Sequence, residues 1–76
     1  MYRYLIIIEH GSHNLSAYVP DLPGCAATGA THEELLANMR EAITLHLQGM
    51  IEDGERIPTS NSDPAYIEVS LPHAVP

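Results

Sequence analysis

Residues 31–54 carry the clearest secondary-structure signal of this 76-residue chain. Thr31 followed three residues later by Glu34 forms a capping box, which predicts that a helix begins after Thr31. Gly54 suits a left-handed helix cap, and Pro58 prevents any continuation, so the predicted helix covers residues 32–53. The alternative is an end one turn earlier at Gly49, since glycine costs about 1 kcal/mol against alanine inside a helix. Such a helix is about 33 Å long, and a chain of this length has room for one domain, which we assign to residues 1–76.

The predicted helix is amphipathic. Its apolar stripe consists of Leu35, Leu36, Met39, Ala42, Ile43, His46, Leu47 and Met50. Polar or small residues lie opposite, at Glu34, Ala37, Glu41, Thr44, Gln48 and Glu52. One side of the helix is therefore expected to pack on a sheet, while Leu45 points well away from the apolar stripe.

Strand patterns precede and follow this helix. Residues 1–10 alternate as a first strand, a turn at residues 11–14 leads into a second strand over residues 15–20, and a third covers about residues 25–29. Residues 65–71 alternate as a last strand. The predicted class is α+β, in the order β-β-β-α-β, with one long helix on one face of an antiparallel sheet.

The first predicted strand is apolar on both of its faces, whereas a single helix covers only one face of a sheet. This mismatch predicts that the open face or edge is covered by self-association or by another protein.

The charge is strongly acidic, with 3 arginines against 10 carboxylates and a formal net charge of −7. A negative field repels phosphate backbones and attracts a basic protein, although acidity also serves solubility alone. The single cysteine permits no internal disulfide, and the apolar run at residues 5–8 is far shorter than the ~20 residues that span a bilayer. A cytoplasmic location is expected.

Candidate chemical residues are few. Cys25 is either a nucleophile or, as its neighbours Gly24 and Ala26 favour, a small packed side chain. His10 and His13 have a ligand-like spacing, but zinc requires at least three protein ligands, so we expect exposed turn histidines.

The acidic side chains form either a magnesium site or a solvated docking patch. They are Asp21, Glu41, Glu52, Asp53 and Glu55. The chain has no lysine, no glycine-rich phosphate loop and no G-x-S-x-G motif. We therefore predict a protein that is not an enzyme, with no catalytic residue, cofactor or metal ligand set.

Several motifs occur in a recognisable order: PDLPGC followed by ATG, the helix opening THEEL, the segment NMREAI, and HLQGMIEDGERIP before a polar link and a last strand. With these motifs, residues 17–58 resemble the HicB-like family, the antitoxins of type II toxin–antitoxin pairs. The resemblance implies a degenerate ribonuclease-H-like fold without catalytic carboxylates, and assembly into dimers or larger oligomers. It also implies binding and neutralisation of a small basic HicA-type toxin that cleaves messenger RNA, which agrees with the acidic charge.

Family members often carry a C-terminal segment that binds operator DNA, whereas this sequence ends at Pro76, so direct DNA binding is not expected. One alternative function is a solitary oligomeric regulator without a toxin partner. Another is a metal-dependent nuclease that uses Asp21. For the antitoxin interpretation, we expect partner contacts at Asp21, Leu22, Glu41, Leu45, Glu52 and Asp53.

Overall fold

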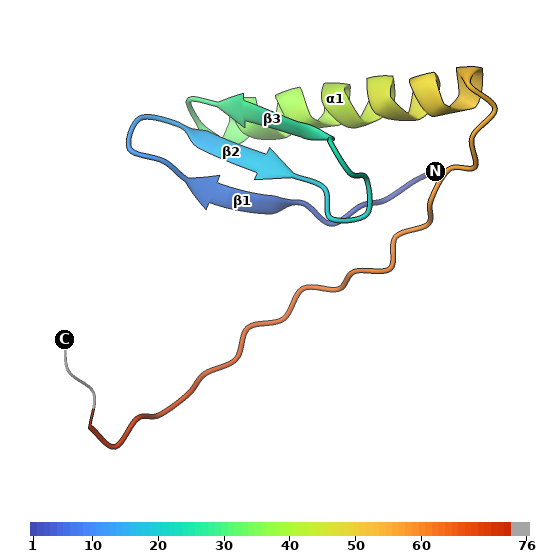
Figure 1. Ribbon diagram of the computed structural model, residues 1–76. Helices are drawn as coiled ribbons and strands as arrows, with labels where there is room; N and C mark the ends of the chain where they lie inside the picture. Colours follow the sequence, from blue (N-terminus) through green and yellow to red (C-terminus); the bar gives the residue numbers. More distant parts are fainter. Residues whose placement is uncertain (74–76) are drawn as a thin grey trace.

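The computed structural model describes residues 1–73, in which three strands precede one helix (Figure 1). The elements are β1 (Ile7–His10), β2 (Leu15–Tyr18), β3 (Ala26–Gly29) and α1 (His32–Glu52). The strands form one antiparallel sheet in the order β1-β2-β3. The α+β class and the order of these four elements are confirmed.

The first strand is shorter than the predicted span of residues 1–10. Ile7 pairs with Tyr18, the last residue of β2, and the chain then leaves the sheet at Val19, whose N–H donates to the carbonyl of Cys25 at 3.1 Å. Residues 1–6 are therefore left without a ladder on β2, and alternation in the sequence does not reveal where the partner strand stops.

Both hairpin turns follow the predicted turn chemistry. The Gly11 N–H donates to the carbonyl of Asn14 at 2.8 Å, which closes the turn between β1 and β2. In the loop between β2 and β3, the Cys25 N–H donates to the carbonyl of Leu22 at 3.1 Å, and Gly24 has a φ of 84°. That left-handed conformation favours glycine and lets the chain reverse within a few residues.

Both ends of α1 are capped as predicted. The hydroxyl of Thr31 accepts from the Glu34 N–H at 3.1 Å, and the Glu34 carboxylate accepts from the Ala30 N–H at 3.3 Å. At the other end Gly54 has a φ of 74°, and the Glu55 N–H donates to the carbonyl of Met50 at 2.8 Å. The Gly54 N–H also donates to the carbonyl of Ile51 at 3.1 Å, and these two C-terminal bonds form a Schellman motif. This motif explains why the helix ends within one residue of the predicted boundary.

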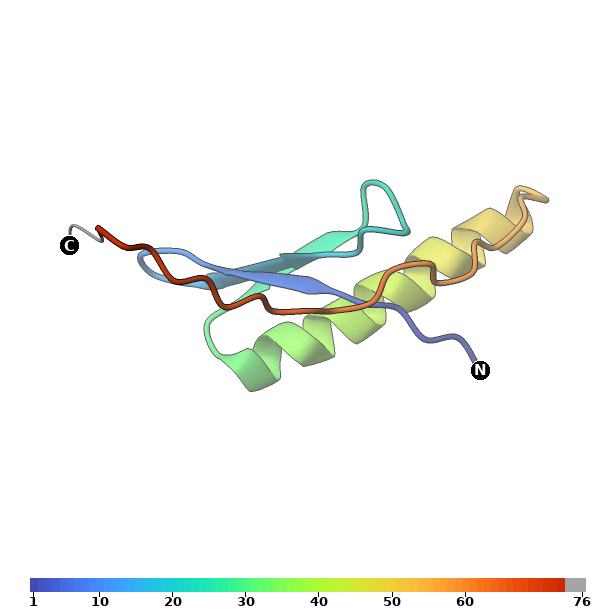
Figure 2. The ribbon, with the colours of Figure 1, turned by 90° about the horizontal axis from the view of Figure 1, so that it is seen from below.

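The helix packs on β3 and β2 from one side of the sheet, and the other side has no covering element in the described residues (Figure 2). The buried core is made of Ala17, Val19, Leu22, Cys25, Leu35, Met39 and Leu47. Of the predicted apolar stripe, Leu36 is exposed, because α1 does not reach over β1. No helix among residues 1–73 is both long and apolar enough to cross a membrane.

The predicted last strand, residues 65–71, is extended but pairs with no strand of the described chain. A strand needs a hydrogen-bonding partner, which the sequence pattern of one segment cannot supply. The radius of gyration is accordingly 15.9 Å, against about 11 Å for a compact chain of this length. The final strand of the predicted order is thus present as an extended segment and absent from the sheet.

Candidate protein-interaction site

Cys25 lies in the core and not in an open catalytic loop. Its side chain is 5% exposed and belongs to the buried cluster beneath α1. Burial raises the pKa of the Cys25 thiol, because the thiolate loses hydration in this position. A nucleophilic cysteine needs the opposite shift. The burial of the Cys25 side chain agrees with its interpretation as a small packed residue.

We expect Cys25 to react slowly with a thiol reagent in the folded protein and quickly in denaturant. Because the folded thiol keeps its proton at pH values where the unfolded thiol loses it, unfolding releases a proton and stability falls as the pH rises past 9.0, the ordinary pKa of the group. The rates of labelling with iodoacetamide across this pH range, with and without denaturant, measure how far folding protects the Cys25 thiol. Equal rates with and without denaturant would show that the side chain is accessible.

The histidines of the first turn, His10 and His13, are exposed. Among residues 1–73, no group of three or more histidine, cysteine, aspartate or glutamate side chains is arranged to hold a metal ion.

Two of the predicted contact residues, Asp21 and Leu22, lie in the loop between β2 and β3. Leu22 is 1% exposed and fills the core, so its side chain is not presented to a partner. The Asp21 carboxylate is half-buried and accepts from the Ser62 hydroxyl at 3.2 Å and from the Asn61 N–H at 3.2 Å. Asp21 therefore fixes the chain that follows the helix.

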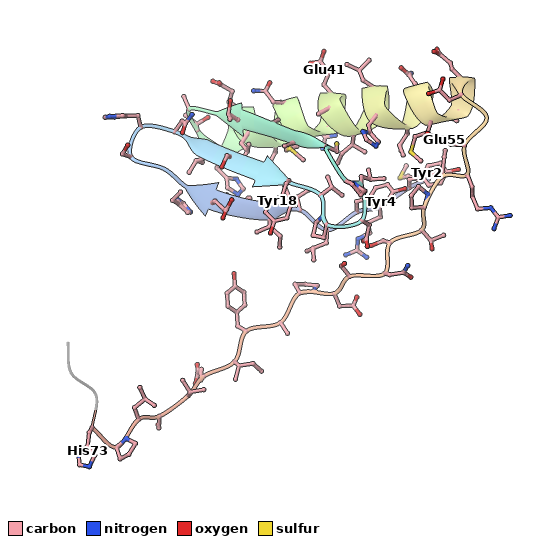
Figure 3. All side chains as sticks on the ribbon, in the orientation of Figure 1. Tyr2, Tyr4, Tyr18, Glu41, Glu55 and His73 are labelled. Carbon is pink, nitrogen blue, oxygen red and sulfur yellow. The ribbon has the colours of Figure 1, made fainter. Side chains whose placement is uncertain are left out.

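The other four predicted contact residues belong to α1 and its C-cap. Glu41 points away from the sheet (Figure 3). Leu45 and Glu52 follow it at helical spacing, and Asp53 caps the helix. All four are exposed, and Leu45 is 60% exposed. We call Glu41, Leu45, Glu52 and Asp53 the outer helix face. This surface combines three carboxylates with one apolar side chain.

A groove of about 600 Å³ separates the first residues of the chain from α1. Tyr2, Tyr4 and Ile6 line one side, and Leu36, Ile43 and Ile51 are among the residues of the other. The Tyr4 hydroxyl donates to the carbonyl of Pro58. Burial, followed by the charges of Tyr2 and Asp21, raises the Tyr4 pKa above its ordinary value of 10.0, so the hydroxyl keeps its proton into more alkaline solution.

The contacts of Tyr4 and Asp21 together hold residues 58–62, which we call the tail root. Beyond the root, residues 63–73 form the tail, which runs along the β1 side of the molecule (Figure 1). The hydrogen bonds of Asp21 join residues 39 to 41 positions apart. No local pattern signals such a contact, so the sequence did not predict it.

The motif order and this α+β geometry agree with known proteins. A profile described as the HicB-like antitoxin of bacterial toxin–antitoxin systems matches residues 4–74. The chain belongs to the HicB-like antitoxin family. The match spans all four elements and the tail up to its last described residue.

Two relatives, one from a phage and one from an archaeon, are similar to this chain over most of its length. A 14.9 kDa protein from the rep-hol intergenic region of Haemophilus phage HP1 is 44% identical over 64 residues, which cover 84% of this chain and 48% of that protein. A UPF0150 protein of Thermoplasma acidophilum is 36% identical over 64 residues, covering 80% of this chain and 90% of that protein. The HicB-like chain thus spans about half the length of the phage relative and most of the archaeal one.

The structure also resembles one chain of a solved HicA3 and HicB3 toxin–antitoxin complex. The TM-score is 0.69 at 30% sequence identity, and the match covers 80% of this chain and 71% of that chain. The HicB-like fold is therefore supported by the backbone as well as by the sequence.

Proposed function

We propose that this HicB-like protein is the antitoxin of a toxin–antitoxin pair and acts by binding rather than by catalysis. Its partner would be a small basic HicA-type toxin that cleaves messenger RNA, in the cytoplasm. The observation that carries the proposal is the likeness, at a TM-score of 0.69 and 30% identity, to a chain of the HicA3 and HicB3 complex.

The outer helix face is the surface on which we place the toxin. A net charge of −7 steers a basic protein toward this chain, and carboxylates at Glu41, Glu52 and Asp53 would meet its cationic side chains. Leu45 supplies an apolar centre of the kind that is desolvated within a charged rim. Leu22 is excluded from this surface by its burial, and the Asp21 carboxylate is occupied by the tail root.

The test is co-expression of this chain with a small basic HicA-type protein. We expect the two proteins to purify together, and we expect growth to recover from the toxicity of the partner. The absence of a complex, or toxicity that persists when both are made, would leave the solitary regulator as the better interpretation.

Charge reversal tests the surface itself. We expect Glu41→Lys to weaken toxin binding about tenfold, or about 1.4 kcal/mol, because it removes an attractive group and adds a repulsive one. Glu55→Lys is the matched control, since Glu55 is also exposed and lies after the helix, outside the outer helix face (Figure 3). Calorimetric titration of both variants at one salt concentration decides the point. Equal losses in both would mean that only net charge matters.

A further inference from the structure

The tail is the least covered part of the described chain. Tyr66 is 98% exposed and Ile67 is 82% exposed, and the large apolar side chains of Val69 and Leu71 are exposed as well. The segment nevertheless keeps the alternation of a half-buried strand, with Tyr66, Glu68 and Ser70 on one side and Ile67, Val69 and Leu71 on the other. A row of exposed apolar side chains on an extended backbone marks an interaction surface.

The edge of β1 is open in the same region. The sheet order is β1-β2-β3, so β1 has a partner on one side only, and its outer N–H and C=O groups are available to another strand. A channel of about 590 Å³ separates this edge from the tail of the same chain. Residues 5–8 line one side of the channel, and residues 63–66 line the other.

The tail root explains why the tail of the same chain does not close this channel. Tyr4 holds Pro58, and Asp21 holds Asn61 and Ser62, so the tail leaves the domain from a fixed point beside the channel. From there it runs in the same direction as β1 without pairing with it (Figure 1). Closing the channel with its own tail would require these contacts to shift.

We propose that a second copy of this chain inserts its tail into the channel, and that the exchange is reciprocal. Because each tail runs with its own β1, a twofold axis makes the inserted tail antiparallel to both strands that flank it. The two copies then form one continuous sheet in the order β3-β2-β1-tail-tail-β1-β2-β3. The inference concerns self-association alone and does not depend on toxin binding.

A second copy fits the channel because each chain carries both halves of the contact, an open edge and a free strand. The apolar row of the inserted tail, Ile67, Val69 and Leu71, then faces the helix side of the sheet. There it continues the layer of Ile6 and Ile8, which pack against the core. Tyr66, Glu68 and Ser70 then lie on the uncovered face of the sheet. A toxin strand in the channel would leave the apolar row of the tail exposed.

The mass in solution gives the first test. By light scattering, we expect the full chain at micromolar concentration to have twice the chain mass of 8.3 kDa. Val69→Pro removes a ladder N–H and should give the monomer mass, whereas Val69→Ile keeps the strand and should keep the dimer. The helical circular dichroism of both variants should match that of the parent protein. A monomeric parent, or a Val69→Pro variant that folds and remains dimeric, overturns the proposal.

An isotope-filtered NOE spectrum of a mixture of labelled and unlabelled full-length chains gives the second test, which needs no variant. We expect NOEs between tail amides of labelled chains and residues 5–8 of unlabelled chains. If these NOEs occur only within one chain, each tail pairs with its own β1 and the exchange is refuted. This measurement also decides the matter if Val69→Pro fails to fold.

Discussion

Leu35→Ala is expected to lower the free energy of unfolding by about 2–5 kcal/mol. Leu35 is 0% exposed and packs in the centre of the core cluster, where α1 meets β3 and β2. Its truncation removes apolar contacts and leaves a cavity that a small domain can refill only in part. A chain of this size has a total stability of about 4–11 kcal/mol, so this one change removes a large share of it.

The measurement is thermal or urea unfolding followed by circular dichroism at a fixed protein concentration, because self-association makes stability depend on concentration. The melting temperature should fall by about 8 °C or more. Leu45→Ala is the matched control, because this leucine is on the same helix and is 60% exposed. We expect the control to change stability by less than about 0.5 kcal/mol. Similar losses for both leucines would mean that the outer helix face is buried in the protein.

Gly29→Ala is expected to destabilise the domain by about 1–3 kcal/mol, although the added group is only one methyl. A Cβ at Gly29 would lie 2.6 Å from the backbone nitrogen of Leu35 and 2.7 Å from its Cα. Backbone atoms at the start of a helix cannot rotate away as a flexible side chain can, so β3 and α1 must separate.

Gly49→Ala is the matched control for this change and is expected to act in the opposite direction. Apart from its chain neighbours and the backbone of α1 itself, a Cβ at Gly49 would meet no atom within 4 Å, and the residue lies inside α1. Alanine at an open helical position should stabilise the protein by about 0.5–1 kcal/mol. The two variants are compared by urea unfolding. A Gly29→Ala variant as stable as the parent protein would contradict the close packing of β3 against α1, and a destabilised Gly49→Ala variant would show that this position of α1 is not open.

The sequence-based predictions agree best with the structure for caps and turns, whose hydrogen bonds join residues that are close together in the sequence. The capping residues Thr31 and Glu34, the C-cap at Gly54 and the turn glycine Gly24 all act through atoms a few residues away. Their hydrogen bonds are therefore encoded in short segments. The buried position of Cys25 could also be predicted, from its small neighbours and the absence of a nearby cation in the sequence.

The candidate site was less predictable. The outer helix face follows from helical periodicity, so the exposure of Glu41, Leu45 and Glu52 could be predicted. The sequence predicts a partner contact at Leu22, whereas the loop folds the Leu22 side chain back into the core. The role of Asp21 as a hydrogen-bond acceptor for the tail root required the three-dimensional path of the chain.

The sequence by itself determined the types of the first four elements, the helix ends, the two turns and the family, because each depends on short-range chemistry or on motif order. Only the tertiary structure decided that β1 begins at Ile7, that α1 packs on β2 and β3, and that the tail pairs with no strand among residues 1–73. The physical reason is that strand pairing is a property of two segments. Alternation makes residues 65–71 suitable for a sheet, and the position of a free edge determines where they can pair.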